Sequence, residues 1–327
     1  MVKKLMGIDI GGTKCAVILG RMENNTLGDI IIVDKTAFPT KLNKGLDDVL
    51  GSIFAHIDAI LTANKWKAHE LYGIGISCGG PLDSKKGIIV SPPNLIGWDN
   101  VPIVEIFEKR YKIKTKLQND ANACALAEWK FGAGKGFRNI IFLTFGTGIG
   151  AGLILDGRLY SGTNGMAGEV GHIRLDDNGP VGYGKSGSFE GFCSGGGIAQ
   201  LARIRVLEKL QMRERVSLCD SVDKLDELDA KTVGEAAENG NELAQEIYRE
   251  SGRYLGKGLS ILIDILNPEI IVIGGIFSRR RELLWPEAHE VIKRECLNDS
   301  QRVCRVVPSD LGEEIGDYAA LAVALNG

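Results

Sequence analysis

Two carboxylates in this chain stand where a side chain could take part in phosphate or proton chemistry. Asp9 lies inside an apolar strand that runs into the paired glycines Gly11 and Gly12. Asp120 lies where a predicted strand ends and a predicted helix begins, a junction at which α/β proteins bind ligands. An aspartate at such a junction can also do no more than cap the helix. Both interpretations of Asp120 stay open at this point.

The first glycine-rich turn predicts a phosphate site. Gly11, Gly12, Thr13 and Lys14 connect two apolar runs, which indicates a β-hairpin. Glycines let backbone N–H groups approach phosphate oxygens. A carboxylate beside a phosphate is repelled unless a cation lies between them, so Asp9 suggests Mg²⁺. The alternative is an ordinary hairpin whose buried aspartate is bonded to backbone donors.

A second hairpin repeats this design. The segment 142–155 places Gly146, Thr147 and Gly148 in a turn between two apolar strands. Two hairpins of the same kind, about one domain apart, indicate an internal duplication. We expect each turn to hold one phosphate group of a nucleotide between two lobes.

One motif match is rejected. Residues 179–186, GPVGYGKS, satisfy the P-loop pattern, which needs a buried strand before it and a helix after it. The preceding residues Asp176, Asp177 and Asn178 make a poor buried strand, and the following residues 187–197 make a poor helix. We therefore expect no P-loop here.

Composition excludes some classes of protein. The chain has 327 residues, enough for two domains, and a formal net charge of −3, which gives no electrostatic argument for nucleic acid or an anionic membrane. No apolar run approaches the length of a membrane span, and no signal peptide fits the first residues. Seven scattered cysteines indicate reduced thiols and a cytoplasmic protein.

Alternating strands and helices predict an α/β fold. Apolar spacing predicts helices over 46–61, 103–111, 121–131, 243–266 and 315–325, and strands over 30–33, 72–77, 113–117, 269–273 and 302–307. We expect 161–197 to be mostly loop.

Six ordered motifs make the chain resemble the ROK family of sugar kinases, in the actin/hexokinase superfamily. They are DIGGTK at 9–14, GGPLD at 79–83, NDANACALAE at 119–128, GTGIGAG at 146–152, GEVGH at 168–172 and LNPEIIVIGG at 266–275. The resemblance covers nearly the whole chain. It implies a two-lobed actin-like (ribonuclease H-like) fold with mixed sheets and a central cleft. We place the first lobe at 1–118 with the C-terminal helix 312–327, and the second at 119–311.

The resemblance also implies an activity, the transfer of the γ-phosphate of ATP to a hexose hydroxyl, with glucose as the expected sugar. Asp120 matches the catalytic base, and both glycine turns would face the phosphates of Mg-ATP. Gly274 and Gly275 would lie near the adenosine. The remaining matches would bind the sugar, whose hydroxyls both donate and accept hydrogen bonds. They are Gly80, Asn94, Asn119, Glu169, His172 and Glu190.

The chain departs from the family pattern at a structural zinc site. Val181, Tyr183 and Ser188 stand where the pattern has three cysteines, and His172 alone cannot hold the metal. We therefore expect no zinc.

Several alternatives remain. The sugar could instead be N-acetylglucosamine, N-acetylmannosamine, fructose or allose. A protein of another class, a non-catalytic sugar sensor or transcriptional repressor, would carry a DNA-binding segment ahead of the first strand, where we expect none. The resemblance implies a homodimer or homotetramer.

Overall fold

The computed structural model describes residues 2–23, 30–40 and 45–326, and all structural statements below concern these residues. The chain forms two compact units. The first combines Met1–Arg138, Gly152–Ala167 and Asp310–Gly327, and the second combines Asn139–Ala151 and Gly168–Ser309. These units do not coincide with the lobes expected from sequence, which remain a prediction.

The first sheet has five strands in the order β3-β2-β1-β4-β7. The predicted first hairpin is confirmed, since β1 and β2 pair antiparallel with Asp9 opposite Ala16. Strands β4 and β7 continue the sheet in parallel. The strands are β1 (Lys3–Ile10), β2 (Lys14–Met22), β3 (Ile30–Pro39), β4 (Leu71–Cys78) and β7 (Thr115–Asn119).

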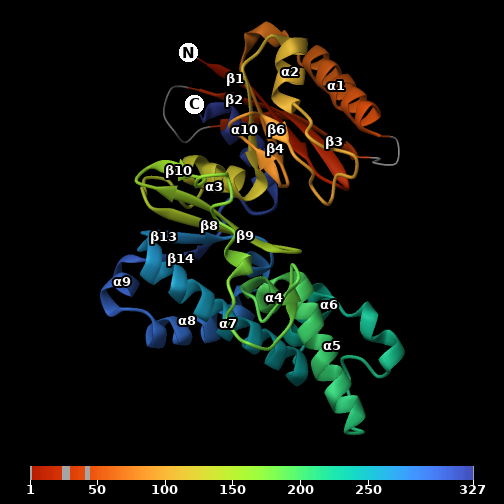
Figure 1. Cartoon of the computed structure of the whole chain (residues 1–327), viewed down its shortest axis with the longest axis vertical. Coiled ribbons are helices and arrows are strands. Elements are labelled where there is room, and N and C mark those ends of the chain that lie inside the picture. Colours follow the sequence, from red (N-terminus) through yellow and green to blue (C-terminus); the bar gives the residue numbers. More distant parts are fainter. Residues whose placement is uncertain (1, 24–29, 41–44, 327) are drawn as a thin grey trace. The chain divides into compact units, whose positions relative to one another are not determined.

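Helices cover both faces of this sheet (Figure 1). On one face, α1 (Leu46–Ala63) and α2 (Ile103–Tyr111) bury their apolar stripes against β1, β2 and β4. On the other face lies α10 (Ile315–Leu325), the helix from the C-terminal end of the chain. Its close packing depends on glycine, because a Cβ atom at Gly75 would lie 2.1 Å from the carbonyl oxygen of Ala320. Helix α10 therefore belongs to the first unit.

The remaining elements of the first unit are short, apart from α3. They are η2 (Ala68–Glu70), β5 (Leu82–Asp83), β6 (Ile88–Ile89), α3 (Asp120–Phe131), β10 (Arg158–Tyr160) and η5 (Gly312–Glu314).

The second sheet has the strand order β10-β9-β8-β13-β14. Its central strands β8 and β13 are apolar except for Thr144, as expected for strands covered on both faces. Strand β13 runs parallel to β8, with Ile273 opposite Leu143. The strands not yet given are β8 (Ile140–Phe145), β9 (Ile149–Leu155), β13 (Ile270–Ile273) and β14 (Arg305–Pro308).

Helices make up most of the other elements of the second unit. The longest, α7, begins at Glu242 and is ended by Asn267, which adopts the left-handed conformation (φ 44°). The other elements are η3 (Val170–His172), β11 (Val181–Gly182), β12 (Lys185–Ser186), α4 (Phe189–Cys193), α5 (Gly195–Gln211), η4 (Val222–Glu227), α6 (Ala230–Glu238), α7 (Glu242–Leu266), α8 (Ile276–Glu295) and α9 (Asn298–Val303).

Some sequence expectations were wrong. The segment 161–197 is mostly loop, as expected, but it also contains a short hairpin, the helix α4 and the start of α5, which were not anticipated. The strand expected from Arg302 begins only at Arg305, because α9 extends to Val303. Helix α8 was not predicted, and its charged sequence with Pro286 inside and a kink at Arg280 explains the weak signal.

Two further findings concern the cysteines and the length of the helices. All seven cysteines are free thiols. None of the helices formed by the described residues is long and apolar enough to cross a membrane.

Candidate active site

The parallel strands of the first sheet bring several predicted site residues to one edge. In the strand register Asp9 lies opposite Ser77, and Cys78 lies opposite Asn119. The carboxyl ends of β1, β4 and β7 therefore meet, which is where open α/β sheets bind ligands. The residues that follow these strands include Gly80 and Asp120.

The cap of α3 is Asn119, not Asp120. The Oδ1 atom of Asn119 accepts hydrogen bonds from the backbone N–H groups of Ala121 (3.0 Å) and Asn122 (3.3 Å). Asp120 is the first helical residue, and its Oδ1 accepts from Ala121 N–H at 2.8 Å. The alternative that Asp120 serves only as the N-cap is therefore wrong.

The loop that carries Asn94 contacts the first glycine turn. The turn is closed by a hydrogen bond from Gly11 N–H to the carbonyl oxygen of Lys14, 3.0 Å long. A Cβ atom at Gly12 would lie 2.4 Å from the carbonyl oxygen of Asn94. Only glycine permits this approach. Near the same sheet edge, a Cβ at Gly80 would lie 3.5 Å from the amide nitrogen of Asn119. Thr13 and Lys14 have exposed side chains.

Asp9 sits in a negatively charged environment. Burial, and then the neighbouring carboxylates of Asp120 and Asp317, raise the pKa of Asp9 to about 6, while Lys14 and Lys35 oppose this rise. The first turn of α10 supplies Asp317, which is buried and pairs with Lys35 Nζ at 2.6 Å. Sequence reasoning did not single out Asp317 or Lys35. The available signal was an acidic residue at the start of an otherwise apolar helix.

The pKa of Asp120 is also raised above its usual range. Desolvation of its carboxyl group by the surrounding protein atoms is the main cause, although the residue as a whole is exposed to solvent. Hydrogen bonds from the backbone N–H of Ala121 and from the Asn119 side chain oppose the shift. A raised pKa makes this carboxylate a better proton acceptor once it is ionised.

The donor set around Asp9 fits Mg²⁺. The ion prefers oxygen ligands and is commonly held by one or two carboxylates together with substrate phosphates. A cation bound to Asp9 would offset the repulsion from the neighbouring carboxylates that raises its pKa. Among the described residues no group of three or more His, Cys, Asp or Glu side chains is arranged to hold a metal without substrate.

In the second unit, the other glycine turn lies against Glu190. The Oε2 atom of Glu190 accepts a hydrogen bond from Ile149 N–H at 3.0 Å. A Cβ at Gly148 would lie 2.7 Å from that oxygen. Gly275 approaches from the end of β13, where its Cβ would lie 2.1 Å from the carbonyl oxygen of Phe145. The preceding Gly274 donates its N–H to the carbonyl of Leu143 at 3.0 Å.

A helix N-terminus also reaches this turn, and sequence reasoning missed it. Helix α5 begins with three glycines, and Gly195 N–H donates to the carbonyl oxygen of Gly146 at 2.8 Å. Ser194 caps the helix through a bond from Gly197 N–H, 3.0 Å long. Helix N-termini favour phosphate groups because their N–H groups are unpaired and their dipole is positive. Thr147, at the tip of the turn, is exposed.

Three predicted sugar contacts come together in the second unit. Glu169 precedes η3, and His172 ends it. Between them, a Cβ at Gly171 would lie 3.2 Å from the Cβ of Glu190. Glu190 is in turn carried by α4, whose Phe189 N–H donates to the carbonyl of Ile173 at 2.8 Å.

The residues at the expected zinc positions do not suit the metal. Ser188 is fully buried and uses its hydroxyl to cap α4, accepting from Gly191 N–H at 3.0 Å. Tyr183 is 84% exposed. Val181 has no ligand atom in its side chain.

The P-loop match is rejected, though partly for another reason than expected. A helix does follow it, because α4 begins at Phe189. However, Lys185 and Ser186 form strand β12, paired with β11, and no phosphate-cradling loop exists there.

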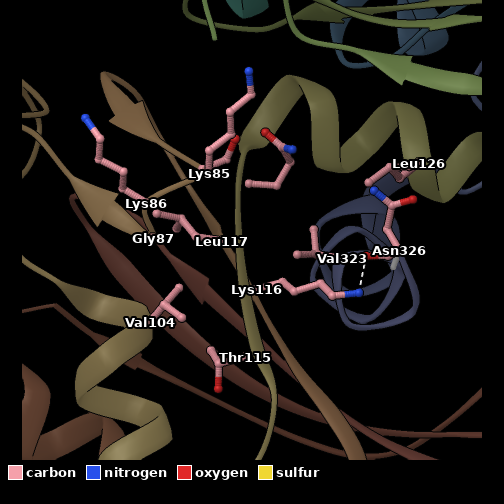
Figure 2. A pocket seen from close by; sticks show the side chains of 12 residues that line it. Lys85, Lys86, Gly87, Val104, Thr115, Lys116, Leu117, Leu126, Val323 and Asn326 are labelled. Atoms are coloured by element: carbon pink, nitrogen blue, oxygen red, sulfur yellow. Dashed lines mark hydrogen bonds between the residues drawn. The ribbon is translucent and has the colours of Figure 1, made fainter. Parts of the chain in front are cut away.

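A separate cavity of about 320 Å³ lies beside β7 in the first unit (Figure 2). Lys116 points toward the end of α10, where its ammonium donates to the carbonyl oxygen of Asn326. None of the predicted site residues lines this cavity. Gln118 lines it and accepts a hydrogen bond from Asn119 N–H at 2.9 Å. The cavity is therefore distinct from the predicted sugar site, although it borders the residue that caps α3.

The predicted residues thus fall into two sets. The first unit brings together residues of the first glycine turn and of the sheet edge: Asp9, Gly11, Gly12, Thr13, Lys14, Gly80, Asn94, Asn119 and Asp120. The second unit holds Gly146, Thr147, Gly148, Glu169, His172, Glu190, Gly274 and Gly275.

Known proteins are similar to this chain over nearly its whole length. The profile described as ROK family matches residues 5–326. A glucokinase of Thermotoga maritima is 33% identical over 98% of this chain and 96% of its own length. A DNA-binding transcriptional dual regulator of Escherichia coli is 30% identical over 98% of this chain and 76% of its own length.

Solved structures resemble the fold as well. The crystal structure of a glucokinase from Streptomyces griseus, in complex with glucose and AMPPNP, matches with a TM-score of 0.75 and 29% identity. The match covers 99% of this chain and 100% of that one. The expected two-lobed α/β fold with mixed sheets, of the actin-like type, is confirmed.

Proposed function

The chain belongs to the ROK family, and on this basis we propose that it is an ATP-dependent hexose kinase that converts glucose to glucose 6-phosphate. Relatives named as glucokinases that match nearly the whole chain support the kinase class. The choice of glucose rests on those names.

One observation carries the proposal: Asp120 is a carboxylate at the start of α3 that is not needed to cap it. Asn119 has that function. The Asp120 carboxyl group is close enough to raise the pKa of Asp9, which lies at the end of the strand leading into the first glycine turn. A proton acceptor beside a phosphate-binding turn is the combination that phosphoryl transfer to a hydroxyl needs.

The proposed reaction needs one proton acceptor. The sugar hydroxyl loses its proton to Asp120 while its oxygen bonds to the γ-phosphorus in line with the leaving oxygen of ADP. The bond between the γ-phosphorus and the bridging oxygen breaks, and ADP leaves with that electron pair. Asp120 must be ionised when the sugar binds, so we expect turnover to fall at acidic pH.

The other predicted site residues would bind and orient the sugar and the nucleotide. Asn94, Asn119, Glu169, His172 and Glu190 would bond the sugar hydroxyls, because each hydroxyl needs a donor and an acceptor. The two glycine turns would face the phosphates. When bound, Mg²⁺ would neutralise charge on the transferring phosphate, and Asp9 is the residue that would hold it. Gly274 and Gly275 would lie near the adenosine.

A coupled ADP-release assay with Mg-ATP tests the proposal. The sugars would be glucose, mannose, fructose, allose, glucosamine, N-acetylglucosamine and N-acetylmannosamine. We expect turnover with glucose that falls by about 10²- to 10⁴-fold in Asp120→Ala, the usual contribution of a general base. Sugar binding, measured by calorimetry, should persist in the variant. Retained phosphorylation in Asp120→Ala would contradict the role of that residue.

The second candidate is a non-catalytic, sugar-responsive regulator, and the similarity to a DNA-binding regulator favours it. Sugar binding without turnover of any sugar in the panel would support this candidate. A single preferred sugar other than glucose would retain the kinase and correct its substrate.

A further inference from the structure

The β11–β12 hairpin (residues 181–186) stands next to the predicted sugar contacts of the second unit and contains no metal-binding residues. Its strands pair Val181 with Ser186 and Gly182 with Lys185. Tyr183 and Gly184 form the tip, both with positive φ (44° and 75°), as a two-residue type I′ turn requires. A bulky tyrosine in this conformation needs support from the surrounding structure.

One strand of the hairpin is bonded to η3. The Lys185 ammonium donates to the carbonyl oxygen of His172 at 2.7 Å. The neighbouring segment is fixed as well, because Arg174 donates from its guanidinium to the carbonyl oxygen of Ser186 at 2.8 Å. The ring of Tyr183 meets the ring of His172 edge-on, with centroids 6.2 Å apart. His172 is thus held through its backbone and contacted through its ring.

The other strand is bonded to α5. The side-chain amide of Gln200 makes two hydrogen bonds to the backbone of Val181, accepting from its N–H at 2.9 Å and donating to its carbonyl at 2.8 Å. A side-chain amide that pairs in both directions replaces a neighbouring strand. This bond pair holds a hairpin edge that would otherwise be open.

The hairpin also packs directly on Glu190. A Cβ atom at Gly182 would lie 2.8 Å from both the Cβ of Glu190 and the hydroxyl oxygen of Ser188. The Ser188 hydroxyl lies 3.4 Å from the carbonyl oxygen of Gly182. The hairpin therefore contacts two of the predicted sugar-binding residues, His172 and Glu190, from one side.

We infer that this hairpin holds its place without a metal, and that Lys185 and Gln200 are positioning residues for the sugar site. Lys185 fixes the backbone that carries His172. Gln200 fixes the strand that packs on Glu190. The inference rests on the proposed sugar kinase function, since positioning is measured through the sugar.

Kinetics of matched variants provide the first test. Lys185→Met and Gln200→Met keep the length of the side chain and remove the hydrogen bonds. We expect each to raise KM for the sugar by roughly three- to tenfold, with kcat and KM for ATP changed less than about twofold. Lys185→Arg should restore KM. Lys231→Met, at an exposed lysine far along the chain, is the control and should change nothing.

Two outcomes would overturn the positioning role. One is an unchanged KM for the sugar in both variants. The other is a parallel loss of kcat, both KM values and thermal stability, which would indicate a purely structural function. Metal content is measured on the same preparations. About one zinc per chain, or inactivation by 1,10-phenanthroline, would contradict the metal-free hairpin.

A spectroscopic readout separates this inference from the kinase proposal. The chain has four histidines, so the ring signals of ¹³C-labelled histidine are few, and His172→Gln identifies one of them. Lys185→Met should shift the His172 signal and leave the other three unchanged. If the unmodified protein phosphorylates no sugar, the proposed function fails while this shift still tests the hairpin. An unmoved His172 signal would refute the contact itself.

Discussion

At the scale of single residues, the charge on Asp9 opposes folding. Its pKa in the folded protein is about 6, above the ordinary value of 3.8. The folded state therefore binds more protons than the unfolded state between these two values. The destabilising effect grows as the pH rises from about 4 to 6 and is complete above 6.

We predict that Asp9→Asn raises the free energy of unfolding at pH 7.5 by about 1–3 kcal/mol, since each pKa unit corresponds to about 1.4 kcal/mol. The gain should shrink at pH 5 and disappear near pH 4. Urea unfolding at several pH values measures it, with the exposed Asp299→Asn as control. A gain that does not depend on pH would show that the charge is not its cause. The same variant should lose most kinase activity, if Asp9 holds Mg²⁺.

The sequence identified Asp9, Asn119 and Asp120 as site residues, but it did not show which of Asn119 and Asp120 caps α3. The spacing Asn119-Asp120 was compatible with a cap at either position, because both residue types cap helices well. The structure resolves this, because Asn119 accepts the two backbone hydrogen bonds. Asp317 was out of reach, since its proximity to Asp9 arises from packing between segments more than 300 residues apart.

At the scale of elements, helix α10 packs closely against a face of the first sheet where glycines present no side chains. Gly7 and Gly20 bring their backbones close to Ala320 and Leu321, and Gly75 touches the helix backbone itself. A side chain at these positions would push the helix away from the sheet. The same helix carries Asp317, so its docking also sets the charge environment of Asp9.

We predict that Gly75→Ala destabilises the protein by about 3 kcal/mol, because the new Cβ would meet backbone atoms that cannot move aside. Gly51→Ala is the matched control. Gly51 is an exposed position of α1 with no atom within 4 Å of an added Cβ, and alanine there should stabilise by about 0.5–1 kcal/mol. Equal effects of the two substitutions in denaturant unfolding would be inconsistent with close packing of α10.

Elements with a strong apolar period were predicted well. The helices expected at 46–61, 103–111 and 315–325 agree with α1, α2 and α10. The failures share a cause: α8 and the start of α5 are helical despite weak local signals. The three glycines of α5 are poor helix formers, but they allow the helix to begin against the carbonyl oxygens of Gly146 and Gly191.

At the scale of the whole molecule, the chain does not divide into two successive halves. The first unit combines three separate segments, and α10 completes it from the far end of the sequence. Glu128 links these segments further, since its carboxylate accepts from Leu311 N–H at 3.2 Å and from Ala133 N–H at 2.8 Å. The resemblance, rather than any local pattern, led us to expect the C-terminal helix in the first lobe, and that division into lobes remains a prediction.

We predict that Leu321→Ala, which creates a cavity under α10, loosens the first unit selectively. Leu321 is fully buried against Gly20, and such a truncation removes about 2–5 kcal/mol. Hydrogen exchange followed by mass spectrometry should show faster exchange in β1 and β4, with α7 little changed. Equal acceleration in both units would indicate that the chain unfolds as one cooperative body.

The reactivity of the seven free thiols depends on whether the protein is folded. Five are buried, and burial raises the pKa of Cys78, Cys124 and Cys193, while the pKa of Cys304 rises to about 12. Only the thiolate reacts with alkylating reagents and oxidants, so these four thiols react slowly while the protein is folded. Each one becomes reactive when its surroundings open. The rate of alkylation at each of these four cysteines therefore measures local opening, in both units and without any added label.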